Sequence, residues 1–366
     1  MSQSGMSSMN SSTSTMIDVL TPIWQRVLQL SSIGVEDNFF DLGGDSVLAV
    51  QLFAEIAQSC GREFPPVMIY HAPTIAALAA LLEQPATSGF PPLVLLRAGT
   101  GEPPVFIAHG LGGSAMDFFQ LVKHIEVPNP IYGMQAKGID GVDEPFERIE
   151  DMAEFHLDAI KKLQPHGPYV LIGYSLGGLV ALEMAQRLSA NRETIALLAM
   201  LDAYPYVTYL SRGQRLRLMA RQAGQHASAL RKLPSQEAFS YVNRLFERGL
   251  RMLADLSGSA SYQPPIGVSY SPAMQRVRDK AYLALTRYRP RFYPGKISFV
   301  RAAVSSDFPE DPAAVWAKLV NEIEVKTVPG DHLGIVTTHF ESLASALSHD
   351  LNGALHPRES RKNLNQ

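Results

Sequence analysis

The sequence has little cysteine and no excess of charge, and both scarcities limit what the chain can be. Cys60 is its one cysteine, which excludes an internal disulfide framework and a four-thiolate zinc site, and we expect no metal site. The net charge of −3 lacks the basic excess that binds phosphates, so we expect no nucleic-acid partner. No apolar run approaches a membrane span, and no basic segment precedes an apolar core near the first residue. These features favour a soluble protein of a reducing compartment, the cytoplasm.

The first part of the chain has the pattern of a small helical domain. Residues 1–15 are nearly all Ser, Thr, Met, Asn and Gln without an apolar period, which predicts a disordered leader. Over residues 16–84, apolar residues recur at helical spacing in stretches separated by Gly- and Pro-containing loops. This pattern predicts a helical bundle close to the lower size limit for an independent core. Residues 85–92 are rich in Pro, Gly, Ser and Thr and are predicted to be a linker.

Beyond the linker, short β-branched runs mostly alternate with helical stretches over residues 93–352. The expected strands are 93–96, 105–108, 131–134, 169–172, 195–201, 297–300 and 323–328. Continuous apolar strands separated by helices are typical of a mostly parallel sheet with helices on both faces. The segment from about 204 to 294 interrupts this alternation and indicates several helices inserted between two strands. Residues 353–366 are predicted to form a polar tail.

One motif in this second domain suggests nucleophilic chemistry. Gly173-Tyr174-Ser175-Leu176-Gly177-Gly178 lies between an expected strand and an expected helix. Glycines on both sides of a serine permit the tight strand-to-helix turn of a nucleophile elbow, which raises the hydroxyl above the sheet. The motif therefore predicts Ser175 as a nucleophile. A serine needs a base, so a carboxylate and then a histidine should follow it along the chain.

The base and acid are sought at the ends of later strands. His332 lies in the loop Pro329–His332 after the last expected strand, at the edge of the sheet where the elbow also lies. His339 is instead expected on a helix surface. Asp202 ends the strand after the elbow helix and Asp307 follows the next strand. Either carboxylate could orient the imidazole, and spacing alone does not choose between them.

An oxyanion intermediate also requires backbone N–H donors near the nucleophile. The N–H of Leu176, at the start of the elbow helix, is one candidate. The Gly-rich loop His109–Gly113 could bring a second donor close, and Leu111 is the residue we expect to supply it. His109 is a base by type, but its position suggests that it supports this loop.

A second motif, Asp41-Leu42-Gly43-Gly44-Asp45-Ser46, lies in the helical domain and ends on a serine that opens a helix. Such a serine is most often a helix N-cap. A helix N-terminus also favours a covalently attached phosphate, because its free N–H groups and dipole attract negative charge.

Both domains resemble known families. Residues 39–46 (FFDLGGDS) resemble the phosphopantetheine attachment site of peptidyl carrier domains from nonribosomal peptide synthetases. GYSLGG, the Gly-rich loop after His109 and PGDHLG resemble the type I thioesterase, an α/β-hydrolase that ends such assembly lines. The resemblance implies a four-helix carrier bundle followed by an α/β-hydrolase domain with a helical lid over about 204–294. It further implies 4′-phosphopantetheine on Ser46, Ser175 as acyl nucleophile and His332 as base. Asp202 is implied as the acid, because in this family the acid follows the strand after the elbow.

The implied function is that of a terminal carrier–thioesterase unit. It would accept an acyl or peptidyl thioester on Ser46, transfer the acyl group to Ser175 and release it by hydrolysis or cyclisation. Upstream synthetase modules and a phosphopantetheinyl transferase are the implied partners. Asp45 departs from the family, since many carriers have His there. The alternatives are an editing thioesterase, a catalytically silent carrier-binding module, and a generic esterase, which would leave the carrier motif unexplained.

Overall fold

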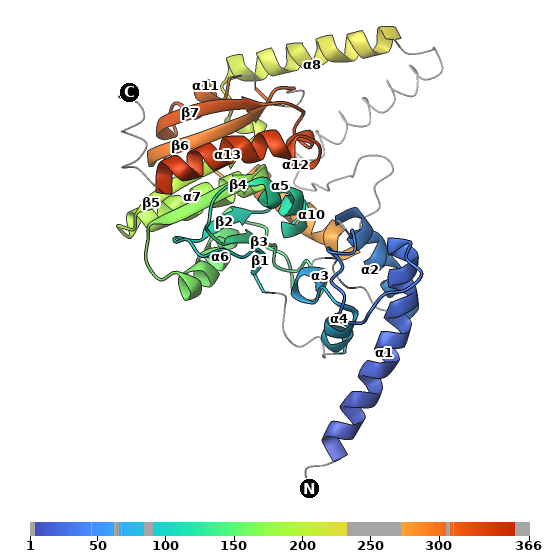
Figure 1. Cartoon of the computed structure of the whole chain (residues 1–366). Coiled ribbons are helices and arrows are strands. Elements are labelled where there is room, and N and C mark those ends of the chain that lie inside the picture. The colour runs from blue at the N-terminus through green and yellow to red at the C-terminus, as the bar shows by residue number, and fades with distance from the viewer. Residues whose placement is uncertain are drawn as a thin grey trace, which may run out of the picture.

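The computed structural model describes residues 4–44, 46–61, 64, 66, 68–83, 91–232, 272–304, 308–309 and 311–355. The helical domain contains α1 (Ser4–Leu28), α2 (Ser46–Cys60), α3 (Met68–His71) and α4 (Ile75–Leu82) (Figure 1). Trp24 and Phe39 are fully buried at its centre. Thr74 caps α4 by accepting a hydrogen bond from the N–H of Ala77 at 3.1 Å.

The leader differs from the expectation of disorder, because α1 begins at Ser4. The segment contains no proline before Pro22, and a helix already fixed by the packed residues that follow extends at little cost. The predicted linker lies almost entirely outside the described residues, which resume at Pro91, and so does the tail beyond Leu355.

The second domain is built on a seven-stranded sheet with the order β1-β3-β2-β4-β5-β6-β7. Only β1 is antiparallel, to β3, and the remaining pairs are parallel. The strands are β1 (Leu93–Arg97), β2 (Val105–Ala108), β3 (Ile131–Met134), β4 (Tyr169–Tyr174), β5 (Ile195–Leu201), β6 (Tyr293–Ala302) and β7 (Val320–Val328). The expected mostly parallel sheet is therefore confirmed, with each predicted strand in place.

Helices cover both faces of this sheet. The described helices of this domain are η1 (Ala115–Phe118), α5 (Phe119–His124), α6 (Ile149–Leu163), α7 (Leu176–Ala190), η2 (Val207–Tyr209), α8 (Arg212–Lys232), α10 (Pro272–Arg287), α11 (Pro312–Trp316), α12 (Gly334–Thr337) and α13 (Phe340–Leu355). Along β2, Val105 and Ile107 pack with α5 and α13, while Phe106 and Ala108 pack with α6 and α7 on the opposite face. This alternation explains why β2 is apolar throughout. Among the described residues, no helix combines the length and apolar character needed to cross a membrane.

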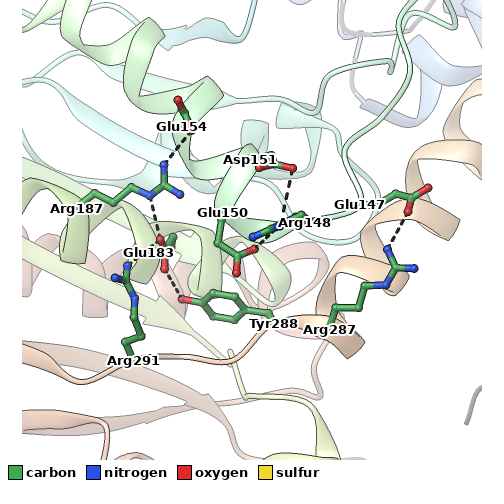
Figure 2. A network of polar contacts seen from close by, with 10 residues as sticks. All are labelled: Glu147, Arg148, Glu150, Asp151, Glu154, Glu183, Arg187, Arg287, Tyr288 and Arg291. Atoms are coloured by element: carbon green, nitrogen blue, oxygen red, sulfur yellow. Dashed lines mark hydrogen bonds and ion pairs between the residues drawn. The ribbon is translucent and has the colours of Figure 1, made fainter. Parts of the chain in front are cut away.

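The insertion between β5 and β6 contributes α8 and α10, and residues 233–271 of it lie outside the described residues. The end of α10 is tied to the body of the domain by polar contacts (Figure 2). Arg287 contacts Glu147 at 2.8 Å, and the Tyr288 hydroxyl donates to Glu183 at 3.0 Å. In contrast, α8 extends along the end of the molecule away from the carrier helices (Figure 1).

Candidate active site

Ser175 occupies a strained turn between β4 and α7. Its backbone has φ of 54° and ψ of −120°, a conformation that costs an L-residue about 1–3 kcal/mol. Two hydrogen bonds hold the turn: the Ser175 N–H donates to the Leu201 carbonyl at 2.9 Å, and the Gly178 N–H donates to the Ser175 carbonyl at 3.1 Å. A strained serine between a strand and a helix is the geometry expected of a nucleophile elbow.

The glycines of the motif are required by close backbone contacts. A Cβ at Gly173 would lie 2.1 Å from the carbonyl oxygen of Gly177. A Cβ at Gly177 would lie 2.3 Å from the carbonyl oxygen of His109, at the start of the Gly-rich loop. Both distances are far below van der Waals contact, so α7 can approach β2 and β4 this closely only with glycine at these positions.

The structure brings Ser175, His332 and Asp202 into one hydrogen-bonded series. The His332 Nε2 lies 3.0 Å from the Ser175 Oγ, and its Nδ1 lies 2.8 Å from the Asp202 Oδ2. With the imidazole proton on Nδ1, that nitrogen donates to the carboxylate and Nε2 accepts the serine hydroxyl proton. This arrangement can remove a proton from the serine as the oxygen attacks an acyl carbon.

Asp202 is fixed in place by β6. Its side chain is 1% exposed, and its Oδ1 accepts the N–H of Ala302 at 3.1 Å. Its own N–H donates to the Val300 carbonyl at 2.7 Å, and its φ is +47°. The carboxylate is therefore oriented by backbone groups before it contacts the imidazole. The competing Asp307 lies outside the described residues.

His332 lies in the loop between β7 and α12, as its position after the last strand predicts. Gly330 turns this loop with φ of +97°, and Asp331 closes it by accepting the N–H of Gly334 at 2.7 Å. His339 is not the surface residue that we expected. It is half-buried just before α13 and packs behind the turn, where a Cβ on Gly330 would lie 2.5 Å from its ring.

The Gly-rich loop lies next to the serine. A Cβ on Gly110 would lie 3.8 Å from the Ser175 Cβ, and the Gly113 N–H donates to the Gly110 carbonyl at 3.1 Å. Within the described part of the chain, neither Leu111 nor Leu176 donates its N–H to a backbone oxygen. His109 is buried, with its Nδ1 2.7 Å from the Gly110 carbonyl, so it supports the loop from behind.

Sequence reasoning missed the aromatic side chains around the imidazole. The Tyr174 ring stacks on His332 with centroids 5.0 Å apart, and the Tyr174 hydroxyl donates to the His332 carbonyl at 2.8 Å. Phe308 lies 4.8 Å from the same imidazole and stacks on Tyr204 at 4.9 Å. The position of Tyr174 beside the serine was the available signal for the first contact. Nothing in the spacing of Phe308 indicates the second.

In the helical domain, α2 begins at Ser46, and Asp45 lies outside the described residues. The preceding loop turns at Gly43, with φ of +93°, and the Gly44 N–H donates to the Phe39 carbonyl at 2.9 Å. A serine at the start of a fifteen-residue helix fits a phosphodiester-linked group, because the first N–H groups of a helix stabilise phosphate charge. The residues present therefore fit 4′-phosphopantetheine.

A serine held at a strand-to-helix turn of a mostly parallel sheet is typical of the α/β-hydrolase class, and the sheet order agrees with it. Within that class, the thioesterase domain family matches residues 103–351, and the phosphopantetheine attachment site matches residues 18–82. The chain belongs to the thioesterase domain family, and a phosphopantetheine attachment domain precedes its thioesterase domain. It is a thioesterase, and its cofactor is covalently bound 4′-phosphopantetheine.

Relatives of the chain are synthetases. The dimodular nonribosomal peptide synthase of Bacillus subtilis (strain 168) is 41% identical over 189 residues, which are 51% of this chain and 8% of that protein. Malpibaldin synthetase of Mortierella alpina is 30% identical over 323 residues, which are 86% of this chain and 5% of that protein. The chain thus spans a small fraction of the length of these relatives. A solved four-domain nonribosomal peptide synthetase shares its fold, with a TM-score of 0.54 and 22% identity over 92% of this chain and 26% of that one.

Proposed function

We propose that the chain is the terminal carrier–thioesterase unit of a peptide assembly line, with Ser175 as nucleophile, His332 as base and Asp202 as acid. The observation that carries this proposal is the hydrogen-bonded series from Ser175 through His332 to Asp202, in the same chain as a helix that opens on Ser46. The domain limits we propose are those of the sequence analysis, with the carrier over 16–84 and the thioesterase over 93–352.

The first half-reaction acylates Ser175. The group on Ser46 supplies a terminal thiol that holds the acyl chain as a thioester. His332 Nε2 takes the hydroxyl proton of Ser175 as its Oγ bonds to the acyl carbon, and Asp202 stabilises the resulting imidazolium. The N–H groups of Leu176 and Leu111 donate to the oxyanion. As the carbon–sulfur bond breaks, the proton on Nε2 passes to the leaving sulfur.

The second half-reaction releases the product. His332 removes a proton from water, or from a nucleophile within the acyl chain, as that group attacks the Ser175 ester. The carbon–oxygen bond then breaks and Ser175 recovers its proton from Nε2. Water gives a free acid, and an internal nucleophile gives a macrocycle. The helices of the 204–294 insertion are proposed to form the lid that governs this choice.

Two alternatives make different use of the same site. An editing thioesterase would remove misloaded groups from other carriers, and a silent carrier-binding module would hold acyl chains without cleaving them. The 3.0 Å contact between His332 and Ser175 favours an enzyme over a silent module. The carrier helix bearing Ser46 in the same chain favours product release over editing.

We further propose that a phosphopantetheinyl transferase modifies Ser46 and that upstream synthetase modules load it. The relatives are synthetases that extend far beyond the matched region, which supports such partners. The single cysteine supports a cytoplasmic location.

Labelling with a fluorophosphonate, followed by intact-protein mass spectrometry, tests the assignment of the nucleophile. We expect one adduct in the parent protein and none in Ser175→Ala. Incubation with coenzyme A and a phosphopantetheinyl transferase should add one phosphopantetheine to the parent protein and none to Ser46→Ala. Persistent labelling of Ser175→Ala would overturn the nucleophile, and failure of the parent protein to accept pantetheine would favour a generic esterase.

A further inference from the structure

Two phenylalanine rings are part of the contact between the carrier domain and the thioesterase domain. The centroid of Phe40 lies 4.6 Å from that of Phe119, with an angle of 35° between the ring planes. Phe40 belongs to the carrier loop that leads to Ser46, and Phe119 is the first residue of α5. The side chain of Phe119 is only 6% exposed. Buried apolar side chains of the two domains form one continuous cluster, and α3 also contacts β1 (Figure 1).

On the carrier side, Phe40 is held by the domain core. Phe39 lies 5.5 Å from Phe40, with the rings at 84°, and 5.2 Å from Trp24, with the rings at 79°. Trp24 and Phe39 are fully buried, so their positions are fixed by core packing. The ring of Phe40 is therefore presented by a rigid structure.

The same loop determines where α2 begins. The Gly43 N–H donates to the Phe40 carbonyl at 3.1 Å, and the Phe40 N–H donates to the Asn38 side chain at 2.9 Å. A Cβ on Gly44 would lie 2.4 Å from the Phe39 ring, so the chain passes directly against that ring. The position of Phe40 is thus mechanically coupled to the start of the helix that opens on Ser46.

On the thioesterase side, Lys123 contacts the Phe119 ring, and Arg97 of β1 holds the other end of α5. The Lys123 ammonium lies 3.9 Å from the centroid of the Phe119 ring, one helical turn further on. The Arg97 guanidinium donates to the carbonyls of Val122, at 3.1 Å, and Asn129, at 3.2 Å, and so fixes the end of α5. Through η1, this helix follows directly on the Gly-rich loop beside Ser175.

We propose that Phe119, supported by Lys123, is the docking point for the chain's own carrier domain, which binds it through Phe40. This inference rests on the proposed function and specifies where the loaded carrier sits during acyl transfer. The pair of Phe40 and Phe119 adds specificity to an apolar contact that also includes α3 and β1, because an aromatic pair adds a modest free energy beyond the area that it buries. Docking at Phe119 places the carrier loop that leads to Ser46 against α5, the helix that follows the Gly-rich loop through η1.

The experiment compares two reactions of the full-length protein. Butyryl-coenzyme A and a phosphopantetheinyl transferase load Ser46, and rapid quenching with mass spectrometry follows loss of the butyryl group from the carrier. In parallel, hydrolysis of the free thioester S-butyryl-N-acetylcysteamine reports the chemistry without docking. The variants are Phe40→Leu, Phe119→Leu and their combination. Phe292→Leu is the matched control, because Phe292 is 57% exposed and lies just before β6.

We expect each docking variant to slow carrier-dependent transfer about three- to tenfold, the loss expected for one aromatic pair, with unchanged hydrolysis of the free thioester. The double variant should be no slower than the slower single variant, because both remove the same contact. Equal slowing of both reactions, or unchanged transfer, would overturn the proposed docking point. A further mixture contains a Ser175→Ala protein with a butyryl group on Ser46 and an unloaded parent protein. If the parent protein removes that butyryl group as fast as it removes one from its own Ser46, the carrier of a second chain occupies the docking point and the proposal also fails.

A readout independent of activity separates this proposal from the proposed function. Hydrogen exchange of the backbone amides over 115–124 should be faster in Phe40→Leu than in the parent protein and Phe292→Leu. Failure of the parent protein to hydrolyse either thioester would reject the proposed function, whereas unchanged exchange in Phe40→Leu would reject the docking point.

Discussion

The ring of Tyr174 lies stacked on the imidazole of His332, with centroids 5.0 Å apart and an angle of 24° between the planes. The hydroxyl of the same tyrosine donates to the His332 backbone carbonyl at 2.8 Å. One residue thus restrains both the side chain and the backbone of the proposed base. Because Tyr174 directly precedes Ser175, the elbow and the histidine loop are held in one geometry.

Replacing Tyr174 should therefore lower kcat with little change in KM. In Tyr174→Phe the ring remains and one hydrogen bond is lost, so we expect a decrease of about two- to tenfold. In Tyr174→Leu the stacked ring is lost as well, and the decrease should be larger. Steady-state hydrolysis of a free thioester measures both values. Tyr132→Phe is the control, because Tyr132 lies on β3 and stacks on Phe106 rather than on His332. A raised KM with unchanged kcat would argue against a positioning role.

Asp202→Asn should reduce kcat by about 10³–10⁴-fold, because an amide no longer stabilises the imidazolium or selects the tautomer with the proton on Nδ1. The side-chain shape is kept, so the melting temperature should change little. Asp331→Asn is the neighbouring control: Asp331 precedes His332, and its carboxylate accepts a local hydrogen bond from the Gly334 N–H. Its kcat should stay within about tenfold of the parent value. If kcat falls equally in Asp202→Asn and Asp331→Asn, the carboxylate of Asp202 is not the acid of the proposed relay.

The strands could be predicted because their apolar runs are continuous and buried on both faces, as in Tyr169–Tyr174. The positions of Ser175 and His332 after two strands of the sheet also predicted that their side chains would lie close together at one edge. The choice of Asp202 required the resemblance, because spacing does not say which strand end faces the histidine. The stacking of Tyr174 and Phe308 and the contact between Phe40 and Phe119 depend on side-chain rotamers and domain placement. No local pattern encodes these.

Buried histidines make the stability of the protein sensitive to acid. His156 lies 5.8 Å from His109, and both are 1% exposed. Burial, followed by the nearby His109, holds the pKa of His156 well below its ordinary value, and burial also lowers the pKa of His109. Below about pH 6.5, these two histidines therefore bind protons in the unfolded chain but remain neutral in the folded chain. The free energy of unfolding should fall as the pH is lowered through this range, by about 1.4 kcal/mol per pH unit for each proton.

Urea unfolding between pH 5 and pH 7.5 tests this expectation. His156→Gln removes one of the two titrating groups, so its stability should fall less steeply with acid than that of the parent protein. His349→Gln, which changes an exposed histidine on α13, is the control for the substitution itself. A parent protein as stable at pH 5 as at pH 7 would contradict the prediction.

Glu183 joins α7 to the segment between α10 and β6, and its loss should destabilise the fold. The carboxylate is 2% exposed and accepts hydrogen bonds from Arg187 at 2.9 Å, Tyr288 at 3.0 Å and Arg291 at 3.0 Å (Figure 2). Glu183→Gln keeps the shape but leaves the buried Tyr288 hydroxyl and the arginines with a weaker acceptor. We expect a decrease of about 1–3 kcal/mol in the free energy of unfolding, measured with urea at neutral pH.

Glu147→Gln provides the matched control, because Glu147 also pairs with two cations, Lys280 and Arg287, but is 38% exposed. Water screens that pair, so its loss should cost less than about 1 kcal/mol. The difference between the two variants thus measures what burial adds to a carboxylate that pairs with two cations. If Glu147→Gln destabilises the protein as much as Glu183→Gln, burial of the carboxylate is not what secures the segment between α10 and β6.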